Sequence, residues 1–166
     1  MFRVLTLCAL SFSFAAALAH GATFDRITLS RTACFGTCPV YTVSVTGAGA
    51  ISYSGVRFVA EQGARAATLD AAGLKRLEAA IDAADIDALR DNYAQGDERC
   101  ERAATDHPSE DLVIERSGHE KRIHYYLGCS GPRIDGELAR LAALGRAIDE
   151  IVDTGRWVGE PGAAHE

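Results

Sequence analysis

Hydrophobic and polar residues alternate with a period of two along much of the N-terminal half of the chain, which is typical of half-buried β-strands. In the sequence FDRITLSRT, Ile27 and Leu29 share one face. In VYTVSVT, the alternate residues Tyr41, Val43 and Val45 do the same. These two segments are predicted to be strands.

A third strand follows the glycine-rich segment TGAGA, which suits a tight hairpin turn. In ISYSGVRFV, Ile51 and Tyr53 share one phase, whereas Val56 and Phe58 have the opposite phase. Gly55 lies between the two sets, so the pattern predicts a β-bulge there. The segment ARAATL after it is predicted to add a short edge strand.

The period then changes to that of a helix in LDAAGLKRLEAAIDAADI. Asp70 is a suitable N-cap, and Leu74, Leu77 and Ile81 are spaced as one buried stripe. The sequence IDALRDNY is predicted to continue as a short helix or turn. The segment 94–110 is polar and has no period, so it is predicted to be a long loop.

Two more strands, 111–116 and 121–127, are predicted on either side of a Ser-Gly turn. A final helix is expected to begin near Pro132 and to end at Gly155, with Trp157 folding back onto the core. Its expected buried stripe consists of Ile134, Leu138, Leu141, Ile148 and Val152.

This order of elements, β-β-β(-β)-α-β-β-α, predicts an α+β fold. We expect a single antiparallel sheet of about five to six strands, with two amphipathic helices on one face. Residues 20–158 are predicted to form one domain, and residues 159–166 a flexible tail.

The first residues indicate export. Arg3 precedes an apolar run of about 15 residues, which is short of the ~20 that a membrane-spanning helix needs. Small residues near Ala19 then suit signal-peptide cleavage, with Ala22 as an alternative cleavage position. Residues 1–19 are therefore predicted to be a signal peptide, and a membrane anchor is the competing interpretation.

Charge excludes some classes of partner. The chain has 17 basic and 23 acidic residues, a net charge of −6, and loss of Arg3 with the signal peptide gives −7. The basic residues are scattered, so neither nucleic acid nor an anionic membrane is an expected partner. We expect a protein, a peptide or a component of the cell envelope as partner, no stable membrane span after signal cleavage, and no cofactor.

Four cysteines remain after Cys8 is removed with the signal peptide: Cys34, Cys38, Cys100 and Cys129. An even number in an exported chain is the pattern of disulfides formed in an oxidising compartment. Four cysteines allow three pairings, and the sequence alone selects none of them.

Local geometry favours one pairing. Residues four apart lie ~13 Å from each other in a strand, but within ~6 Å in a bend, where a disulfide can form. Gly36 and Pro39 favour such a bend in CFGTC. In the chain-entropy model, a Cys34–Cys38 bond would stabilise the fold by about 2 kcal/mol. A Cys100–Cys129 bond, which closes a longer loop, would stabilise it by about 3–4 kcal/mol. The crossed pairings and free thiols remain open.

Metal and redox chemistry is the alternative use of these thiols. CFGTCP resembles the CxxxCP motif of Sco-type copper chaperones, in which a distant histidine completes the site, and His124 would take that role with Cys34 and Cys38. Against this, a strand and not a helix follows the second cysteine, and Met1 is the only methionine. A zinc site of all four cysteines lacks a second knuckle.

No catalytic motif of the GxSxG, HExxH or Walker type occurs in the sequence. In the last predicted strand, His124 and Tyr126 share the face opposite Ile123 and Tyr125. Outward aromatic side chains on neighbouring strands would form a hydrogen-bonding surface with them. The candidate binding face consists of Tyr41, Tyr53, His124 and Tyr126.

The stretch ITLSRTACFGTCPVYTVSVTGAGAISYSG is similar to a family of exported bacterial domains of unknown function that carry a CFGxCPxY motif. In that family, the motif lies between two strands and precedes a glycine-rich hairpin and an aromatic–glycine pair, as at Tyr53 and Gly55. Later matches are the DNY ending at Tyr93, and Asp149 and Trp157 near the C-terminus. The resemblance implies a shared fold and an extracytoplasmic setting, and it implies no activity.

The sequence therefore favours a non-enzymatic, disulfide-stabilised binding or structural module, exported to the periplasm or secreted. Its ligand would bind the sheet face or the 94–110 segment. The alternative function is a thiol redox or copper-handling protein that uses Cys34 and Cys38.

Overall fold

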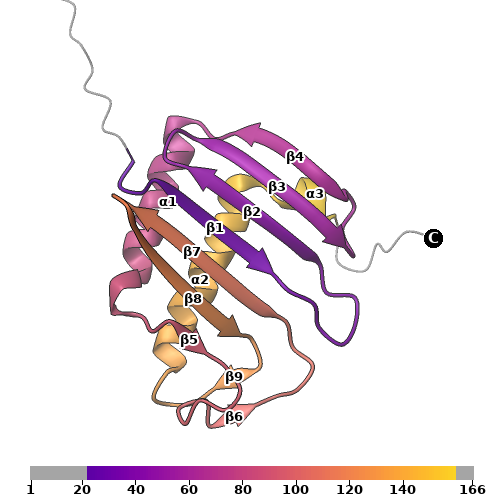
Figure 1. The fold of residues 1–166 in the computed structure, drawn as a ribbon, viewed down its shortest axis with the longest axis vertical. Helices are drawn as coiled ribbons and strands as arrows, with labels where there is room; N and C mark the ends of the chain where they lie inside the picture. The colour runs from indigo at the N-terminus through magenta and orange to yellow at the C-terminus, as the bar shows by residue number, and fades with distance from the viewer. Residues whose placement is uncertain (1–21, 160–166) are drawn as a thin grey trace, which may run out of the picture.

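The computed structural model describes residues 22–159, and the predicted signal peptide and residues 160–166 lie outside this range. A sheet of seven strands in the order β4-β3-β2-β1-β7-β8-β5 carries helices on one face and is open on the other (Figure 1). A second, two-stranded sheet of β6 and β9 lies below it. No helix within residues 22–159 combines the length and the apolar character required to cross a bilayer.

The strands are β1 (Arg26–Arg31), β2 (Val40–Thr46), β3 (Ala50–Arg57), β4 (Gly63–Thr68), β5 (Asn92–Tyr93), β6 (Arg102–Ala103), β7 (Ser109–Arg116), β8 (His119–Tyr126) and β9 (Cys129–Ser130). The helices are α1 (Ala71–Ala84), the short 3₁₀ helix η1 (Ile86–Ala88), α2 (Asp135–Val152) and α3 (Gly155–Val158). The α+β class is confirmed, with α1 and α2 as its two long helices.

The alternation of the strands places their apolar residues under the helices. Leu29 of β1 lies opposite Val43 of β2 on one side and Leu112 of β7 on the other. All three side chains are buried. Polar residues between them face the open side of the sheet, as the period of two requires.

The predicted bulge is present in β3. Tyr41 pairs with Gly55, but its neighbour Val40 pairs with Arg57, so Val56 is the extra residue. Val56 is consequently turned outward and is 59% exposed. A Cβ atom at Gly55 would collide with the carbonyl oxygen of Glu61, which explains why glycine is required there.

Helix α1 begins as the sequence predicts, because the carboxylate of Asp70 accepts a hydrogen bond from the backbone N–H of Gly73 at 2.7 Å. Helix α2 is shorter than predicted. It begins at Asp135 after the Pro132 turn, and it ends before Asp153, which takes the left-handed conformation. The separate helix α3 then carries Trp157 back onto the core.

The prediction of a wholly antiparallel sheet of five to six strands is wrong in two respects. β5 pairs in parallel with β8, placing Asn92 opposite His124 and Tyr93 opposite Tyr125, so the sheet is mixed. The main sheet also has seven strands, and β6 and β9 form a second sheet, so the predicted 94–110 loop in fact contains β6 and the beginning of β7. Strands of two residues are too short to show a period, and their pairing depends on distant partners.

Candidate functional site

The structure contains two disulfides, Cys34–Cys38 and Cys100–Cys129, which is the pairing that the local geometry favours. The Cα atoms are 5.7 Å apart in the first pair and 5.2 Å apart in the second, within the range for a disulfide. The Cys34–Cys38 loop connects β1 to β2. The Cys100–Cys129 bond connects the segment before β6 to β9.

The Cys34–Cys38 loop presents an aromatic side chain to solvent. Phe35 is 89% exposed, which is unusual for a residue of this size. Its backbone N–H donates to the carbonyl oxygen of Asp106 at 3.2 Å, so the loop is attached to the segment that precedes β7. The disulfide and this hydrogen bond hold the backbone while the phenyl ring stays outside the core.

An apolar cleft of about 260 Å³ opens between these two segments. Its walls include Cys38 and Pro39 from the loop, Pro108 from the segment before β7, Leu127 after β8, and Val158 of α3. With Arg31 and Thr32 at the end of β1, five separate parts of the chain shape it. Most of the surface that a ligand would contact there is hydrophobic.

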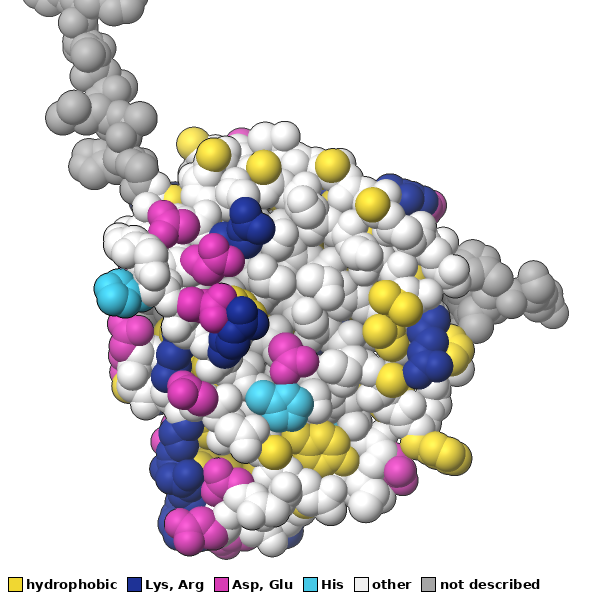
Figure 2. Space-filling model, viewed as in Figure 1, with side chains coloured by type: hydrophobic (Ala, Val, Ile, Leu, Met, Phe, Trp, Pro, Cys, Tyr) yellow, Lys and Arg dark blue, Asp and Glu magenta, His cyan; other side chains and the backbone are white. Residues whose placement is uncertain are grey.

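Exposed hydrophobic side chains gather at the same end of the sheet as the cleft. Within residues 22–159 the large ones are Phe35, Val56 and Phe58, which we call the apolar rim. Val56 and Phe58 lie at the end of β3 that pairs with the beginning of β2. The guanidinium of Arg57 lies 5.4 Å from the centre of the Phe58 ring. Figure 2 shows hydrophobic side chains gathered around a basic one at the right of the view.

A largely buried ion cluster reaches the base of the cleft through Arg31, Tyr41 and Glu110. The guanidinium of Arg31 on β1 pairs with Glu110 of β7 and, at 2.5 Å, with Asp149 of α2. The Tyr41 hydroxyl accepts from Arg31 Nε at 2.9 Å and donates to Asp149 at 2.7 Å. Thr154 also donates to Asp149, at 2.8 Å. We call these five residues the Arg31 cluster.

The environment of the cluster fixes its protonation states. Burial lowers the pKa of Arg31, but the charges of Glu110 and Asp149 outweigh burial and raise it overall. Burial, with the negative charge of Asp149, raises the pKa of Tyr41. At neutral pH Arg31 is therefore charged and Tyr41 is a hydrogen-bond donor.

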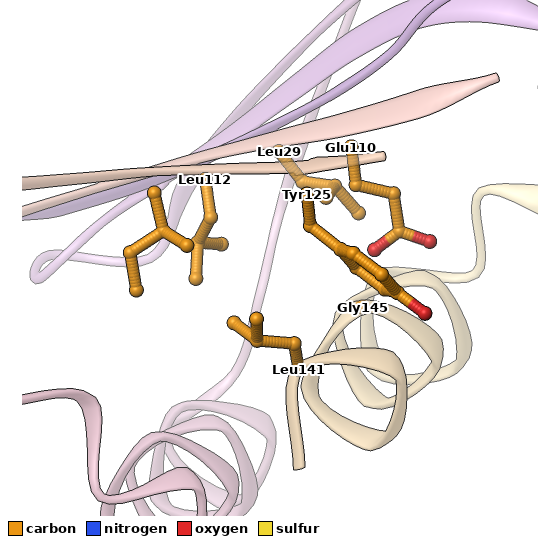
Figure 3. A pocket seen from close by; sticks show the side chains of 7 residues that line it. Leu29, Glu110, Leu112, Tyr125, Leu141 and Gly145 are labelled. Carbon is orange, nitrogen blue, oxygen red and sulfur yellow. The ribbon is translucent and has the colours of Figure 1, made fainter. Parts of the chain in front are cut away.

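Glu110 is the most buried of the three charged residues of the cluster. Burial raises the pKa of its carboxyl, and the charge of Arg31 opposes this effect only in part. Figure 3 shows its carboxylate directed from the sheet toward Gly145 of α2, beside Tyr125. A Cβ atom at position 145 would be 2.5 Å from a Glu110 oxygen, so glycine allows the helix to approach. Glu110 lines both the cleft and a small internal cavity of about 10 Å³.

The four residues of the predicted binding face lie on two opposite faces, and this part of the prediction is wrong. Tyr41 and Tyr53 are only 4% and 2% exposed and lie under the helix layer. Tyr53 packs between Tyr41, with ring centres 5.7 Å apart, and Trp157, 4.9 Å away. His124 and Tyr126 lie on the open face, as expected. Alternation shows which residues share a face, but the helix positions decide which face is covered.

On the open face, His124 and Tyr126 are already engaged. The Nδ1 atom of His124 lies 2.6 Å from a carboxylate oxygen of Asp111. The Tyr126 hydroxyl donates to the carbonyl oxygen of Ala104 at 2.7 Å and accepts from the N–H of His107 at 3.3 Å. Tyr126 thus anchors the segment before β7 instead of pointing freely into solvent.

The copper ligand set considered from the sequence is not assembled. Cys34 and Cys38 are bonded to each other, and His124 is paired with Asp111. In the described part of the chain, no group of three or more His, Cys, Asp or Glu residues is placed to hold a metal ion. The thiol redox or copper-handling function stays a prediction that the structure does not support.

The Cys100–Cys129 disulfide has a different environment. Both cysteines are buried, with exposures of 9% and 4%. Next to it, β6 pairs with β9, placing Ala103 opposite Cys129. The bond therefore attaches a segment of low hydrophobicity to the end of β8, and nothing around it indicates reactivity.

Sequence reasoning did not identify Arg31, Glu110 and Asp149 as a group. A partial signal existed, because Glu110 has the same phase as Leu112 and Ile114 and so was directed toward the core. A charged residue at such a position needs a buried partner. The sequence did not reveal that the partner is Arg31.

Comparison with curated proteins finds no match. The model of a family described as Domain of unknown function (DUF6438) matches residues 25–152, from just before β1 to the end of α2. The matched range contains both disulfides, the cleft except for Val158, and four of the five residues of the Arg31 cluster. The chain therefore belongs to the DUF6438 family.

Proposed function

We propose that this protein is a disulfide-stabilised, non-enzymatic binding module outside the cytoplasm, and that its cleft receives an apolar side chain of a partner protein or peptide. The observation that carries the proposal is the apolar cleft next to the exposed apolar rim. The predicted signal peptide and the two disulfides support the extracytoplasmic setting.

The dimensions of the cleft favour a side chain over a cofactor. Pockets for small molecules usually enclose ~300–1,000 Å³, and this cleft of about 260 Å³ is smaller. Protein interfaces commonly place one large apolar anchor in a pocket of this kind. The proline and leucine walls offer dispersion contacts to such an anchor, and the lining hydroxyl of Ser109 offers a hydrogen bond.

The apolar rim extends the proposed contact area. Large hydrophobic side chains that are exposed together at one end of a fold are candidates for contact with a partner. Phe35, Val56 and Phe58 are all at the cleft end of the sheet, whereas the open face carries mainly serine, threonine and charged residues. A partner that covers the rim would remove this apolar surface from water.

The site is held rigid before any ligand arrives. The Cys34–Cys38 bond, Pro39 and the Phe35–Asp106 hydrogen bond fix one wall, and the Arg31 cluster fixes the base. Preorganisation of this kind reduces the entropy that is lost on binding. This arrangement suits a recognition surface.

Selection of peptides from a phage-displayed random library on the oxidised protein tests the proposal. We expect the selected peptides to share one large apolar residue, and its replacement by alanine to weaken binding at least tenfold in fluorescence anisotropy. Phe35→Ser in the protein is expected to weaken the same peptides.

The matched control is His119→Ser, at the opposite end of the strands, which should leave affinity unchanged. Peptides that bind independently of any apolar residue, or that bind Phe35→Ser as well as the wild type, would exclude this site.

A further inference from the structure

We infer that the free edge of β4 pairs with β4 of a second copy of this chain, giving a two-fold symmetric dimer with one continuous sheet. β4 is a six-residue strand that pairs only with β3. Within residues 22–159 no other strand pairs with its outer side, and Figure 1 shows no element beyond it. Apart from the carbonyl oxygen of Ala64, which accepts a hydrogen bond from Arg65, its outward backbone groups are available to another strand.

The opposite edge of the sheet, formed by β8 and β5, is protected against pairing with another strand, in contrast to the β4 edge. There β5 covers part of β8, and Lys121 donates to the carbonyl oxygen of Leu89 at 2.8 Å and pairs with Asp91 at 2.7 Å. Glu120 and Arg122 add a further charged pair beside it. Short covering strands and charges are the usual protection of a sheet edge against other strands.

β4 has almost none of this protection. Its one charged residue is Arg65, which pairs with Glu61 and donates to the carbonyl oxygen of Ala64 at 2.8 Å. The strand contains no proline and no second charge. The edge is therefore locally neutral, although the whole chain carries a net charge of −6.

A second copy fits this edge because the strand is complementary to itself. Antiparallel pairing that keeps the helices on one side places only residues of the same face opposite each other. Pairing Ala66 with Ala66 puts Arg65 opposite Ala67 and Ala64 opposite Thr68, which avoids contact between the two arginines. All the remaining side chains are small, so the two backbones can approach without a clash.

This dimer would orient two binding sites. Because antiparallel pairing reverses the strand direction, the two apolar rims would lie at opposite ends of the shared sheet. The pairing itself does not depend on the proposed function of the cleft. Alanine pairs add little side-chain energy, so we expect an association that becomes visible between about 10 μM and 1 mM.

Sedimentation equilibrium of the full chain, with both disulfides formed, tests the inference. The weight-average mass is expected to rise from the mass of the monomer toward twice that value over this concentration range. Ala66→Lys places two like charges at the symmetry axis and should keep the protein monomeric at 1 mM. The control Ala48→Lys, in the exposed turn between β2 and β3, should dimerise as the wild type does.

A second measurement tests where the two copies touch, and its expected result is faster cross-linking instead of a loss of dimer. Ala66→Cys should be cross-linked into dimers by a short bis-maleimide at least tenfold faster than Ala48→Cys, because paired residues have Cβ atoms ~5 Å apart. A wild-type protein that is monomeric at 1 mM overturns the inference. So does dimerisation of Ala66→Lys, or equal cross-linking of the two cysteine variants.

Discussion

The two disulfide-bonded regions lie near the same end of the sheet but differ in what surrounds the bond. Cys34 and Cys38 are half-buried on either side of the exposed Phe35, whereas Cys100 and Cys129 lie inside the fold. The first bond closes a surface loop with a sequence separation of 4, and the second closes a separation of 29. The Cys34–Cys38 bond thus shapes a surface loop, whereas the Cys100–Cys129 bond stabilises a segment from inside the fold.

The regions also differ in what else stabilises them. The Cys34–Cys38 loop lies above the Arg31 cluster, which connects β1, β2, β7 and α2 without any contribution from the disulfide. Besides its disulfide, the Cys100–Cys129 region has the two-residue pairing of β6 with β9 and mostly exposed hydrogen bonds, such as those of Arg133 with Glu98 and Glu101. We therefore expect that removing each disulfide, and removing the cluster, will give clearly different losses of stability.

The largest loss is expected from Arg31→Leu. This change leaves Glu110 and Asp149 buried as like charges without their common partner, which costs about 3–5 kcal/mol. Urea denaturation at pH 7 measures this loss. Arg122→Leu, which removes an exposed arginine from the open face, is the control and should change stability by less than ~0.5 kcal/mol. Similar values for both variants would show that the cluster does not stabilise the loop region.

The double variant Cys100→Ala/Cys129→Ala should lose about 3–4 kcal/mol in the chain-entropy model. Hydrogen exchange should increase most in residues 94–104, because the segment is then held by short strand pairing and exposed hydrogen bonds alone. Denaturation together with hydrogen exchange measures both effects. If this variant loses no more stability than Cys34→Ser/Cys38→Ser does, the expected difference between the two disulfide regions is contradicted.

The double variant Cys34→Ser/Cys38→Ser should lose about 2 kcal/mol or less, because it opens only a short loop. Its effect on the selected peptides should be larger than its effect on stability, since the wall of the cleft becomes mobile. Urea denaturation of this variant measures its stability, and fluorescence anisotropy of the same protein measures its affinity for the peptides. Unchanged peptide affinity would show that the disulfide does not shape the site.

The smallest expected effect is a pH dependence at Glu110. Burial raises its pKa in the folded state above the ordinary value of 4.5, so the folded protein holds this proton more tightly than the unfolded chain. The stabilisation that this bound proton gives is complete below the pKa of Glu110 in the unfolded chain. It is lost as pH rises through the pKa of Glu110 in the folded protein. The stability advantage of the wild type over Glu110→Gln should therefore decrease from pH 4 to pH 7, as denaturation at both values would show. A growing advantage would indicate a lowered pKa.

Much of the fold was accessible to sequence reasoning because its signals are local. Asp70 caps α1 through its own turn, and the phase change around Gly55 reports the bulge directly. The Cys34–Cys38 bond was favoured for the same reason, since four residues with a glycine and a proline bend within a short distance. The Arg31 cluster was not accessible, because Arg31 and Asp149 are far apart in the sequence and meet only when α2 packs on the sheet.

The sequence by itself determined the α+β class, the main strands and helices, and which residues share a face, because hydrophobic period and turn chemistry act over a few residues. Only the tertiary structure decided that Tyr41 and Tyr53 are covered, that β5 joins the sheet in parallel, and that five separate segments enclose a cleft. Those outcomes depend on which face the helices cover and on contacts between distant segments, and no local pattern specifies either.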